Sequence, residues 1–468
     1  MGILNQVLGT GIACYICMTM GIMFAWPSCT LNLFQSANTT LSRPMSDGEL
    51  SLFGSLSCIG ALISTPLTGF MLDRVGRKYC AVASAATHVM SWSLIAFCSQ
   101  VEVVLFSIFL CGVGGAVVLI VPVFIGEICQ ESIRGAMTSG SMVFYAIGML
   151  LSYLLGGILE YKTMVYVCMS LSVVGLLLLT ALKETPMFLM IKGLDQEAAK
   201  SFAFYRNAMV DSKEVLQEME KLRRAFNPDL DEENTTPEEE KLKVDEKPVE
   251  TEKPSLWQFV KKSRSTRQAM FVTLTLITAA VFQGLVVLQV YAEPLFQEAV
   301  PNISSTVCSV LLALVTIIAG FIAAYLTDFA GRRPLLIYSS FASGLCCVVL
   351  GSQLHLHWAP HWVTAVVIYL FTTVYSLGPG TVPFLLVAEV FLPEVKSFMS
   401  MFVIEWAWFC NFIILFIFNP LVSAIGLGPV FYLFAGVCAI STVFSVVYLP
   451  ETKGLPVDQI QAHFVKKR

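Results

Sequence analysis

The sequence predicts an all-α membrane protein in which twelve transmembrane helices form two six-helix bundles joined by a cytoplasmic helical linker. Apolar residues make up 56% of the 468-residue chain and charged residues 13%, where a soluble protein carries about 25% charged residues. The apolar residues gather in runs of about 20, the length that crosses a bilayer. The same short motifs also recur in both halves. The net charge of -4, with no basic stripe, excludes a nucleic-acid partner.

The twelve spans follow from segments that lack charge, because an ionised side chain is costly at the centre of a bilayer. In chain order we predict spans at 11–33, 51–71, 79–98, 102–125, 138–159, 163–182, 268–291, 306–326, 334–353, 363–387, 398–420 and 430–449. The first run lacks a preceding basic segment and is interpreted as a transmembrane helix, not as a cleavable signal peptide. The 14 cysteines fall mostly within such runs and are interpreted as small buried hydrophobic residues.

The distribution of basic residues predicts the orientation. Twelve spans place both termini on one side, and all of the 29 Lys and Arg residues except Arg43 and Lys162 fall on that side. By the positive-inside rule both termini are cytoplasmic. Asn38 and Asn302 then head sequons in outer loops and are candidates for glycosylation, unless the sequons arose by chance. We expect an integral, multi-pass protein of the plasma membrane.

The predicted domains are 1–182, an N-terminal six-helix bundle; 183–267, a cytoplasmic linker; 268–449, a C-terminal six-helix bundle; and 450–468, a cytoplasmic tail. Apolar residues at helical spacing from Val215 to Phe226 predict an amphipathic helix within the linker. From 227 to 253 the linker is acidic and rich in proline, which predicts disorder.

Three motifs repeat in the two halves at nearly constant offset, which indicates two fused six-helix units. The first motif is Asp73-Arg74-Val75-Gly76-Arg77-Lys78, and its counterpart is Asp328-Phe329-Ala330-Gly331-Arg332-Arg333. The second is Pro122 with Glu127 and Arg134, and its counterpart is Pro383 with Glu389 and Lys396. The third is Glu184-Thr185-Pro186, and its counterpart is Pro450-Glu451-Thr452-Lys453. The carboxylates and bases sit at cytoplasmic helix ends. We hypothesise that they form an ion-pair network between the halves that holds an outward-open state; the alternative is that they only anchor the topology. The residues of this network are Asp73, Arg77, Glu127, Arg134, Asp328, Arg332, Glu389 and Lys396.

This set of motifs resembles the sugar porter family of the major facilitator superfamily over essentially the whole chain. The residues that carry the resemblance are Gly69 with Asp73 to Lys78, Pro122 with Glu127 and Arg134-Gly135, Gly378 to Phe384 with Glu389 to Phe391, and Leu449 to Gly454. Trp26-Pro27-Ser28 and the closing segment look most similar to insect trehalose and glucose facilitators. The resemblance implies a major facilitator fold and facilitated diffusion of a hexose or trehalose by alternating access.

The substrate site departs from the family pattern. Amide side chains usual in that family are replaced at Ala280, Val281, Val286, Met142 and Thr316, and its usual Pro and Trp are replaced by Thr381 and Phe384. A sugar hydroxyl without a partner costs about 1–3 kcal/mol. The predicted substrate-binding residues are Gln283, Gln289, Tyr291, Thr316, Ser376, Phe384, Trp408 and Asn411. Helical phase places Gln283 and Tyr291 on neighbouring faces, although such polar residues also serve as hydrogen bonds between helices.

Two ionisable side chains lie within predicted spans. Glu405 is a candidate for proton coupling; alternatively it pairs with Lys396 or Arg134 near the cytoplasmic surface. His88 is interpreted first as a packing residue. Two alternatives to a facilitator therefore stay open: a sugar sensor deficient in transport, and a proton-coupled symporter of a sugar or another small organic solute.

The glycines of the fourth span and those near Pro379 either permit gating or serve as static packing notches. No phosphate loop, nucleophile constellation or metal cluster appears in the sequence, so we expect no enzymatic activity, cofactor or metal. The expected partners are a sugar substrate and the lipid bilayer, with no obligate protein partner.

Overall fold

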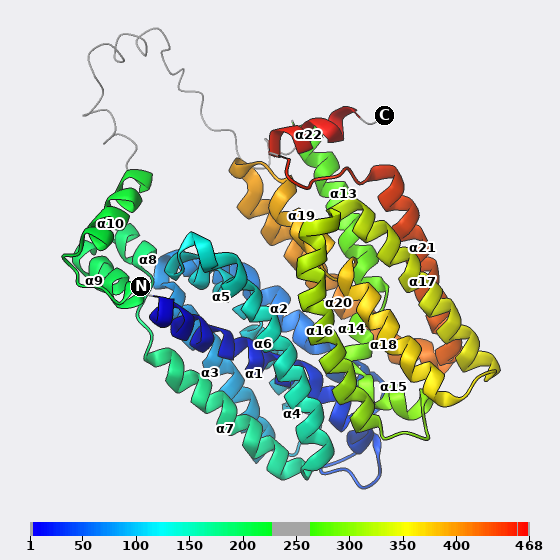
Figure 1. The fold of residues 1–468 in the computed structure, drawn as a ribbon. Helices are drawn as coiled ribbons and strands as arrows, with labels where there is room; N and C mark the ends of the chain where they lie inside the picture. The colour runs from blue at the N-terminus through cyan, green and yellow to red at the C-terminus, as the bar shows by residue number, and fades with distance from the viewer. Residues whose placement is uncertain (1–2, 227–262, 456, 467–468) are drawn as a thin grey trace.

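The computed structural model describes residues 3–226, 263–455 and 457–466, and these residues form helices and connecting loops (Figure 1). The first half contains α1 (Ile3–Gln35), α2 (Asp47–Val75), α3 (Arg77–Phe97), α4 (Val101–Gly114), α5 (Val117–Ile128), α6 (Glu131–Ile158) and α7 (Tyr161–Thr180). The second half contains α13 (Arg264–Phe282), α14 (Leu285–Val290), α15 (Ala292–Ala299), α16 (Ser305–Ala330), α17 (Arg332–Leu356), α18 (His361–Leu377), α19 (Val382–Val390), α20 (Pro393–Ile425) and α21 (Leu427–Tyr448). Four further helices are α8 (Pro186–Ile191), α9 (Asp195–Arg206), α10 (Lys213–Phe226) and α22 (Val457–Lys466).

The twelve predicted spans are confirmed, because the described residues contain 12 helical segments long and apolar enough to cross a membrane. Three spans are each broken into two helices: α4 and α5, α13 and α14, and α18 and α19. At the second break Gly284 has a φ of 96°, a left-handed conformation that favours glycine. The predicted linker helix is α10. The segment 227–253, predicted to be disordered, lies outside the described residues.

The helices separate into two bundles that lie side by side in Figure 1. In the first bundle α1 packs extensively along α6, and in the second α17 packs along α21. The bundles meet where α2 packs against α20 and α6 packs against α16. This is the predicted arrangement of two six-helix units.

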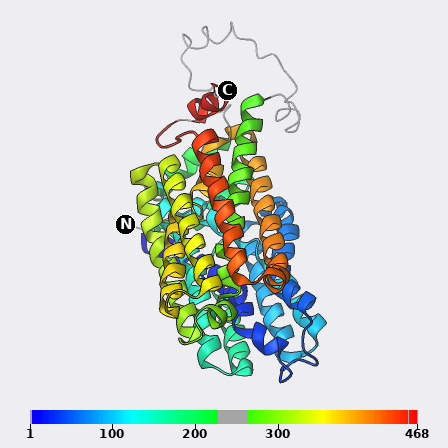
Figure 2. The same ribbon diagram turned by 90° about the vertical axis from the view of Figure 1, so that its right-hand side faces the viewer.

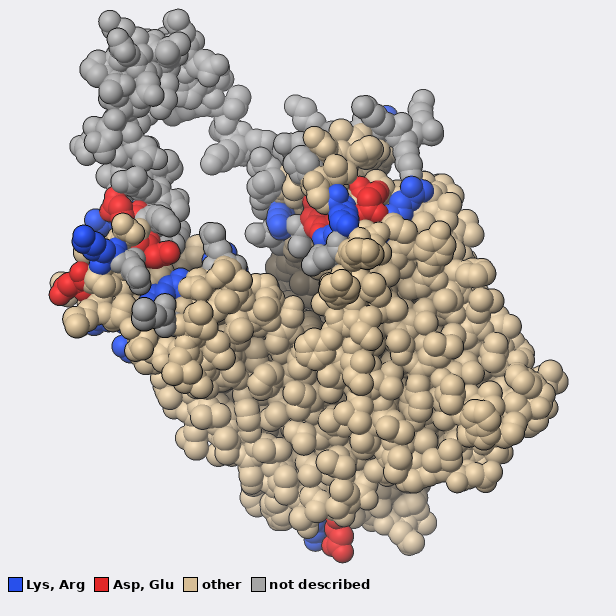
Figure 3. Space-filling view, in the orientation of Figure 1, with Lys and Arg blue, Asp and Glu red and all other residues tan. Residues whose placement is uncertain are grey.

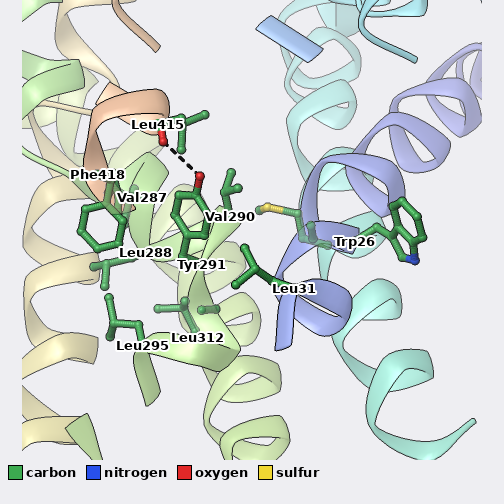
Figure 4. Close-up of a cluster of buried hydrophobic side chains, with 14 of the residues drawn as sticks. Trp26, Leu31, Val287, Leu288, Val290, Tyr291, Leu295, Leu312, Leu415 and Phe418 are labelled. Carbon is green, nitrogen blue, oxygen red and sulfur yellow. Dashed lines mark hydrogen bonds between the residues drawn. The ribbon is translucent and has the colours of Figure 1, made fainter. Parts of the chain in front are cut away.

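The apolar cores differ between the two ends of the molecule. One buried cluster draws residues from both bundles, among them Trp26 and Phe53 from the first and Tyr291 and Phe418 from the second. Figure 4 shows Tyr291 and Leu31 facing each other across this shared core. The remaining bundle interiors form two clusters whose buried residues come from one half each. The two halves are therefore joined by a common core toward the end that carries the predicted outer loops.

Charged side chains lie at the two ends of the molecule with an apolar belt between them (Figure 3). The end that carries α8, α9, α10 and α22 has most of them, and Figure 2 shows α22 lying across this end of the second bundle. At the other end the Arg43 guanidinium binds Glu49 at 2.6 Å and Glu102 at 3.0 Å. This distribution is typical of an integral membrane protein.

Candidate functional site

In the first half, Arg77 is the centre of a buried ion pair at the end of the bundle that carries α8, α9 and α10. Its Nε lies 2.9 Å from Glu127 Oε1, and the side chains of both residues are less than 10% exposed. Its Nη2 lies 3.2 Å from Asp73 Oδ1, and its Nη1 donates to the Leu72 carbonyl oxygen. The loop between α2 and α3 is thereby bound to the end of α5.

Arg332 makes the equivalent contacts in the second half. Its Nη2 lies 2.8 Å from Glu389 Oε1, and its Nη1 donates to the Thr327 carbonyl oxygen. The Thr452 hydroxyl donates to the other Glu389 carboxylate oxygen at 2.7 Å. The repeated motifs therefore build two corresponding ion-pair centres, one in each half.

Two glutamates that the sequence analysis treated only as repeat markers have a defined role. Glu184 Oε1 accepts hydrogen bonds from the backbone N–H groups of Arg77 and Lys78. Glu451 accepts from the backbone N–H groups of Arg332 and Arg333. Each carboxylate therefore caps the N-terminus of a membrane helix, α3 or α17, where backbone N–H groups have no partner within the helix.

The surroundings of Glu451 act in opposite directions on its pKa. Burial raises the pKa, but backbone N–H groups of Lys453, Arg332, Arg333 and Thr452 donate to the carboxylate and together hold the pKa below its ordinary value. Glu451 is consequently a carboxylate at neutral pH and keeps its cap on α17.

Ion pairs across the two halves are absent among the described residues. Arg77 and Arg332 pair within their own halves. Arg134 is exposed and donates to the Cys129 carbonyl oxygen at 3.4 Å. Among the described residues, neither Arg134 nor the exposed Lys396 forms an ion pair. The Asp328 side chain lies outside the described residues. An ion-pair network between the halves stays a prediction for the state in which the ends that carry Arg77 and Arg332 meet.

A small pocket lies between the two halves, midway along the helices. Its walls come from α1, α2 and α4 of the first half and from Trp408 on α20 of the second. The lining side chains are mostly apolar or sulfur-containing: Met20, Met23, Phe24, Pro27, Ser57, Ala61, Ile108, Cys111 and Trp408, with Gly112 and Gly115. Ser57 and the Trp408 indole are the only polar side-chain groups in this lining, and no charged side chain contributes to it.

Close helix packing shapes the back of the pocket. A Cβ atom on Gly112 would lie 2.0 Å from the Ser57 carbonyl oxygen, so α2 and α4 touch through their backbones. Gly115 follows at the break between α4 and α5, and its Cβ would lie 3.2 Å from Ala61. The glycines predicted either to permit gating or to pack statically thus bring two helices together at the pocket.

Of the predicted substrate-binding residues, Trp408 alone lines this pocket. Gln283 is fully buried, and both polar atoms of its amide lack a partner among the described residues. Asn411 is half-buried. The break at Gly284 lies between Gln283 and Tyr291, so the relative directions of these two side chains do not follow from one continuous helix.

Several other predicted polar groups bond to backbone carbonyl oxygens. The Tyr291 hydroxyl donates to Leu415 at 3.0 Å (Figure 4). Thr316 donates to Leu312 and Ser376 to Thr372, both within their own helices. The remaining two predicted residues differ: Gln289 contributes its carbonyl oxygen to a hydrogen bond from Tyr153, and Phe384 is exposed.

Two contacts on the second-half side of the site involve residues outside the predicted set. The Trp406 indole donates to the Thr278 hydroxyl at 2.8 Å, linking α20 to α13. The Tyr375 hydroxyl donates to the Ala280 carbonyl oxygen at 2.8 Å, linking α18 to α13. Both partners on α13 lie near positions where the family usually carries amides. The long sequence separation within each pair left no local signal of these contacts.

Glu405 and His88 are the two ionisable groups within the spans that the sequence singled out. Glu405 is half-buried, and its Oε1 has no partner among the described residues; neither Lys396 nor Arg134 forms an ion pair with it. His88 is buried, with Nδ1 3.0 Å from the Thr19 hydroxyl, and its Nε2 lies beside Gly114. His88 thus packs α3 against α1 and α4.

The halves are hydrogen-bonded to each other at the end opposite the ion-pair centres. Asn32 Nδ2 donates to Gln297 Oε1 at 2.6 Å, and the backbone N–H of Glu293 donates to the Ser28 hydroxyl at 2.8 Å. The Tyr153 hydroxyl donates to the Gln289 carbonyl oxygen. These contacts join α1 and α6 to α14 and α15, and we call them the outer gate. This gate is closed in the structure.

The sequon asparagines Asn38 and Asn302 are exposed in loops next to the outer gate. Asn38 follows α1 and Asn302 follows α15. Both are sterically open to a glycan on the side opposite α8, α9 and α10, and their glycosylation stays a prediction.

Residues 13–464 match the sequence model of the family described as Sugar (and other) transporter. Among curated relatives, the facilitated trehalose transporter Tret1 of Culex quinquefasciatus is 26% identical, over 98% of this chain and 85% of its own length. Trehalose transporter 1 of Drosophila melanogaster is 28% identical, over 95% of this chain and 50% of its own length. The Aedes aegypti relative is covered over 53% of its length, so the chain spans about half of these last two proteins.

Among solved structures, the inward-open xylose transporter XylE from E. coli aligns with a TM-score of 0.77 at 18% identity, covering 97% of this chain and 98% of that one. A D-xylose-proton symporter aligns with a TM-score of 0.72 at 17% identity, covering 96% and 98%. These likenesses show the overall fold.

Proposed function

This chain belongs to the sugar transporter family, and on that premise we propose that it carries a hexose or trehalose across the plasma membrane by facilitated diffusion. The names of the curated relatives support trehalose or a related sugar as the solute. The central pocket between the halves supports a site that is reached from one side at a time. Both termini are cytoplasmic in this proposal, as the distribution of basic residues predicts.

The observation that carries the proposal is the contrast between the two ends of the molecule. The outer gate joins the halves by hydrogen bonds, while at the cytoplasmic end each half keeps its ion pairs to itself. A rocking motion of the halves would break the outer gate without breaking either ion-pair centre. Alternating access needs such an arrangement, with two rigid halves and separable contacts between them.

The pocket supports recognition mainly through apolar surfaces. A pyranose ring presents C–H groups that pack on an aromatic face, and Trp408 offers such a face. Few side-chain groups remain to bind sugar hydroxyls. The Thr278 hydroxyl already accepts a hydrogen bond from Trp406, and the Tyr375 hydroxyl already donates to the Ala280 carbonyl oxygen. We therefore expect weak affinity, with a KM at the high end of the usual range for sugars.

The direct test is uptake of radiolabelled glucose and trehalose into cells that express the chain, with and without an imposed pH gradient. We expect saturable uptake in which the internal sugar concentration never exceeds the external concentration. Trp408→Ala should raise the KM by about tenfold, as expected for loss of about 1–2 kcal/mol of packing. Trp362→Ala, at an exposed tryptophan of α18, is the matched control and should leave the KM unchanged. Absence of uptake with verified surface expression would overturn the proposal.

Proton symport is a second candidate, favoured by the half-buried Glu405 carboxylate with one unpartnered oxygen. A symporter would accumulate sugar against its gradient when the outside is acidic, and Glu405→Gln would abolish the accumulation. Equal final sugar concentrations at every imposed pH gradient would exclude this candidate and leave facilitated diffusion.

A further inference from the structure

Glu293 is a half-buried carboxylate within the outer gate. It lies in the first turn of α15, outside the membrane spans. Its own backbone N–H donates across the interface to the Ser28 hydroxyl at 2.8 Å, so this residue is fixed against the other half. Movement of α15 away from α1 must change the surroundings of its side chain.

The surroundings of the Glu293 side chain contain little that stabilises a negative charge. The Ser305 hydroxyl donates to Oε1 at a long 3.4 Å, and no ion pair to Glu293 occurs among the described residues. Burial raises the pKa of Glu293, and the Ser305 hydrogen bond offsets this only in part. The carboxyl group therefore gains a proton more readily in this closed gate than it would in water.

No base on the helices packed against α15 forms an ion pair with Glu293 among the described residues. These helices are α16, α1, α18 and α14. Helices α1 and α14 contain no charged residue, and α16 carries one only at its cytoplasmic end. The titratable groups of these elements at the outer end are Cys29, Cys308, Tyr369 and His361, with Glu298 on α15 itself.

Of these groups, the Cys29 thiol on α1 interacts electrostatically with Glu293. The Tyr369 hydroxyl donates to the Cys308 carbonyl oxygen. His361 begins α18 and forms no ion pair with Glu293 within the described residues. Glu298 is exposed on α15. Protonation of Glu293 is thus the simplest way to relieve the buried charge.

We propose that Glu293 is a proton-sensitive positioning residue of the outer gate, so that acid on the outer side favours the closed gate and neutral pH favours its opening. The proposal rests on the transport function given above. When the halves separate, water reaches the carboxyl group and the proton is released to the outer solution. By linkage, the state that holds the proton more tightly is stabilised as the pH falls. The proton changes the population of open gates without driving sugar uphill.

The native Cys29 thiol reports gate opening without any transport assay. It lies on the Glu293 side of α1, against Gly156 and the Ser152 carbonyl oxygen of α6. Cys98, at the end of α3, is half-buried and lies outside the gate on the same side of the membrane. In intact cells, a membrane-impermeant thiol reagent would label both from outside, and their rates can be compared at one pH.

The experiment measures the ratio of Cys29 to Cys98 labelling at pH 5.0 and pH 7.5 for wild type, Glu293→Gln and Glu298→Gln. The ratio of the two thiols corrects for the amount of protein and reagent. A negative charge on Glu293 disfavours the Cys29 thiolate, so this direct effect alone would make Cys29 label faster in Glu293→Gln at pH 7.5. A higher ratio in wild type at that pH therefore reports gate opening. We expect wild type and Glu298→Gln to show a ratio about threefold or more above that of Glu293→Gln at pH 7.5. At pH 5.0 the three proteins should converge.

A Glu293→Gln protein with the wild-type ratio at both pH values would overturn the proposal. So would a difference between the two proteins that does not depend on pH, because that would show a purely structural role. This comparison requires Glu293→Gln to reach the cell surface. If it does not, wild type is compared with Glu293→Asp and Glu298→Gln. Glu293→Asp keeps a carboxylate and should keep the pH response of the labelling ratio. If the labelling ratios follow this prediction in a protein that shows no sugar uptake, the proposal for Glu293 holds while the proposed transport function fails.

Discussion

Among single residues, Arg77 and Glu127 form a buried ion pair that contributes to stability. Arg77 and Glu127 are both almost inaccessible to water. Removal of one partner leaves an uncompensated buried charge, which typically costs about 3–5 kcal/mol, whereas replacement of both by apolar residues is often neutral. The two residues should therefore behave as a pair.

We predict that Arg77→Leu lowers the melting temperature of the purified protein strongly, and that Arg77→Leu with Glu127→Leu recovers most of the loss. Arg74→Leu is the control, because Arg74 lies over the Phe70 ring at the exposed surface. Thermal melting followed by size-exclusion chromatography measures all three. A double variant no more stable than Arg77→Leu would contradict the pairing.

Glu451 gives a pH-dependent prediction at the same scale. Its folded-state pKa lies below the ordinary value, so it stabilises the folded state above about pH 4.3, the unfolded pKa of a glutamate. This stabilisation is lost as the pH falls through the folded pKa. Glu451→Gln should lower the melting temperature by about 2 °C at pH 7 and should converge with wild type below pH 4. A difference that stays constant with pH would contradict this account of the α17 cap.

At the scale of elements, the broken seventh span depends on one glycine. Gly284 has a φ of 96°, and a Cβ there would lie 2.5 Å from the Phe434 ring. Gly284→Ala should cost about 1–2 kcal/mol for the left-handed backbone, with a further loss from displacement of Phe434. Gly320 in α16 is the matched control: its Cβ would meet nothing within 4 Å, and Gly320→Ala should be neutral or stabilising. Equal melting temperatures for the two variants would contradict the need for this break.

The same break shows which part of the site could be predicted from the sequence. Charge-free runs predicted all twelve spans, because the bilayer forbids isolated charge, and the repeated motifs predicted two equivalent halves. Helical phase failed to relate Gln283 to Tyr291, because a left-handed residue resets the phase between them. The caps made by Glu184 and Glu451 join residues more than 100 positions apart, and no local pattern indicates such a contact.

For the whole molecule, Arg134 is a residue expected to affect the transport cycle without affecting stability. In this outer-closed structure its side chain is exposed and donates one long hydrogen bond to the Cys129 carbonyl oxygen. We predict that Arg134→Ala leaves the melting temperature unchanged but lowers sugar turnover about fivefold, because its partners would be met only when the cytoplasmic ends close. Uptake normalised to surface expression measures the effect. Unchanged turnover would show that Arg134 only anchors the topology.

If two rigid halves carry sugar by alternating exposure of one site, the protein must exchange sugar across the membrane. Counterflow in proteoliposomes measures this exchange. Vesicles that contain the purified protein are loaded with unlabelled glucose or trehalose and diluted into a trace of the labelled sugar. We predict a transient accumulation of label inside that decays as the gradient dissipates, at any imposed pH gradient. A folded protein that binds sugar but shows no counterflow would contradict the account and identify a sensor in place of a transporter.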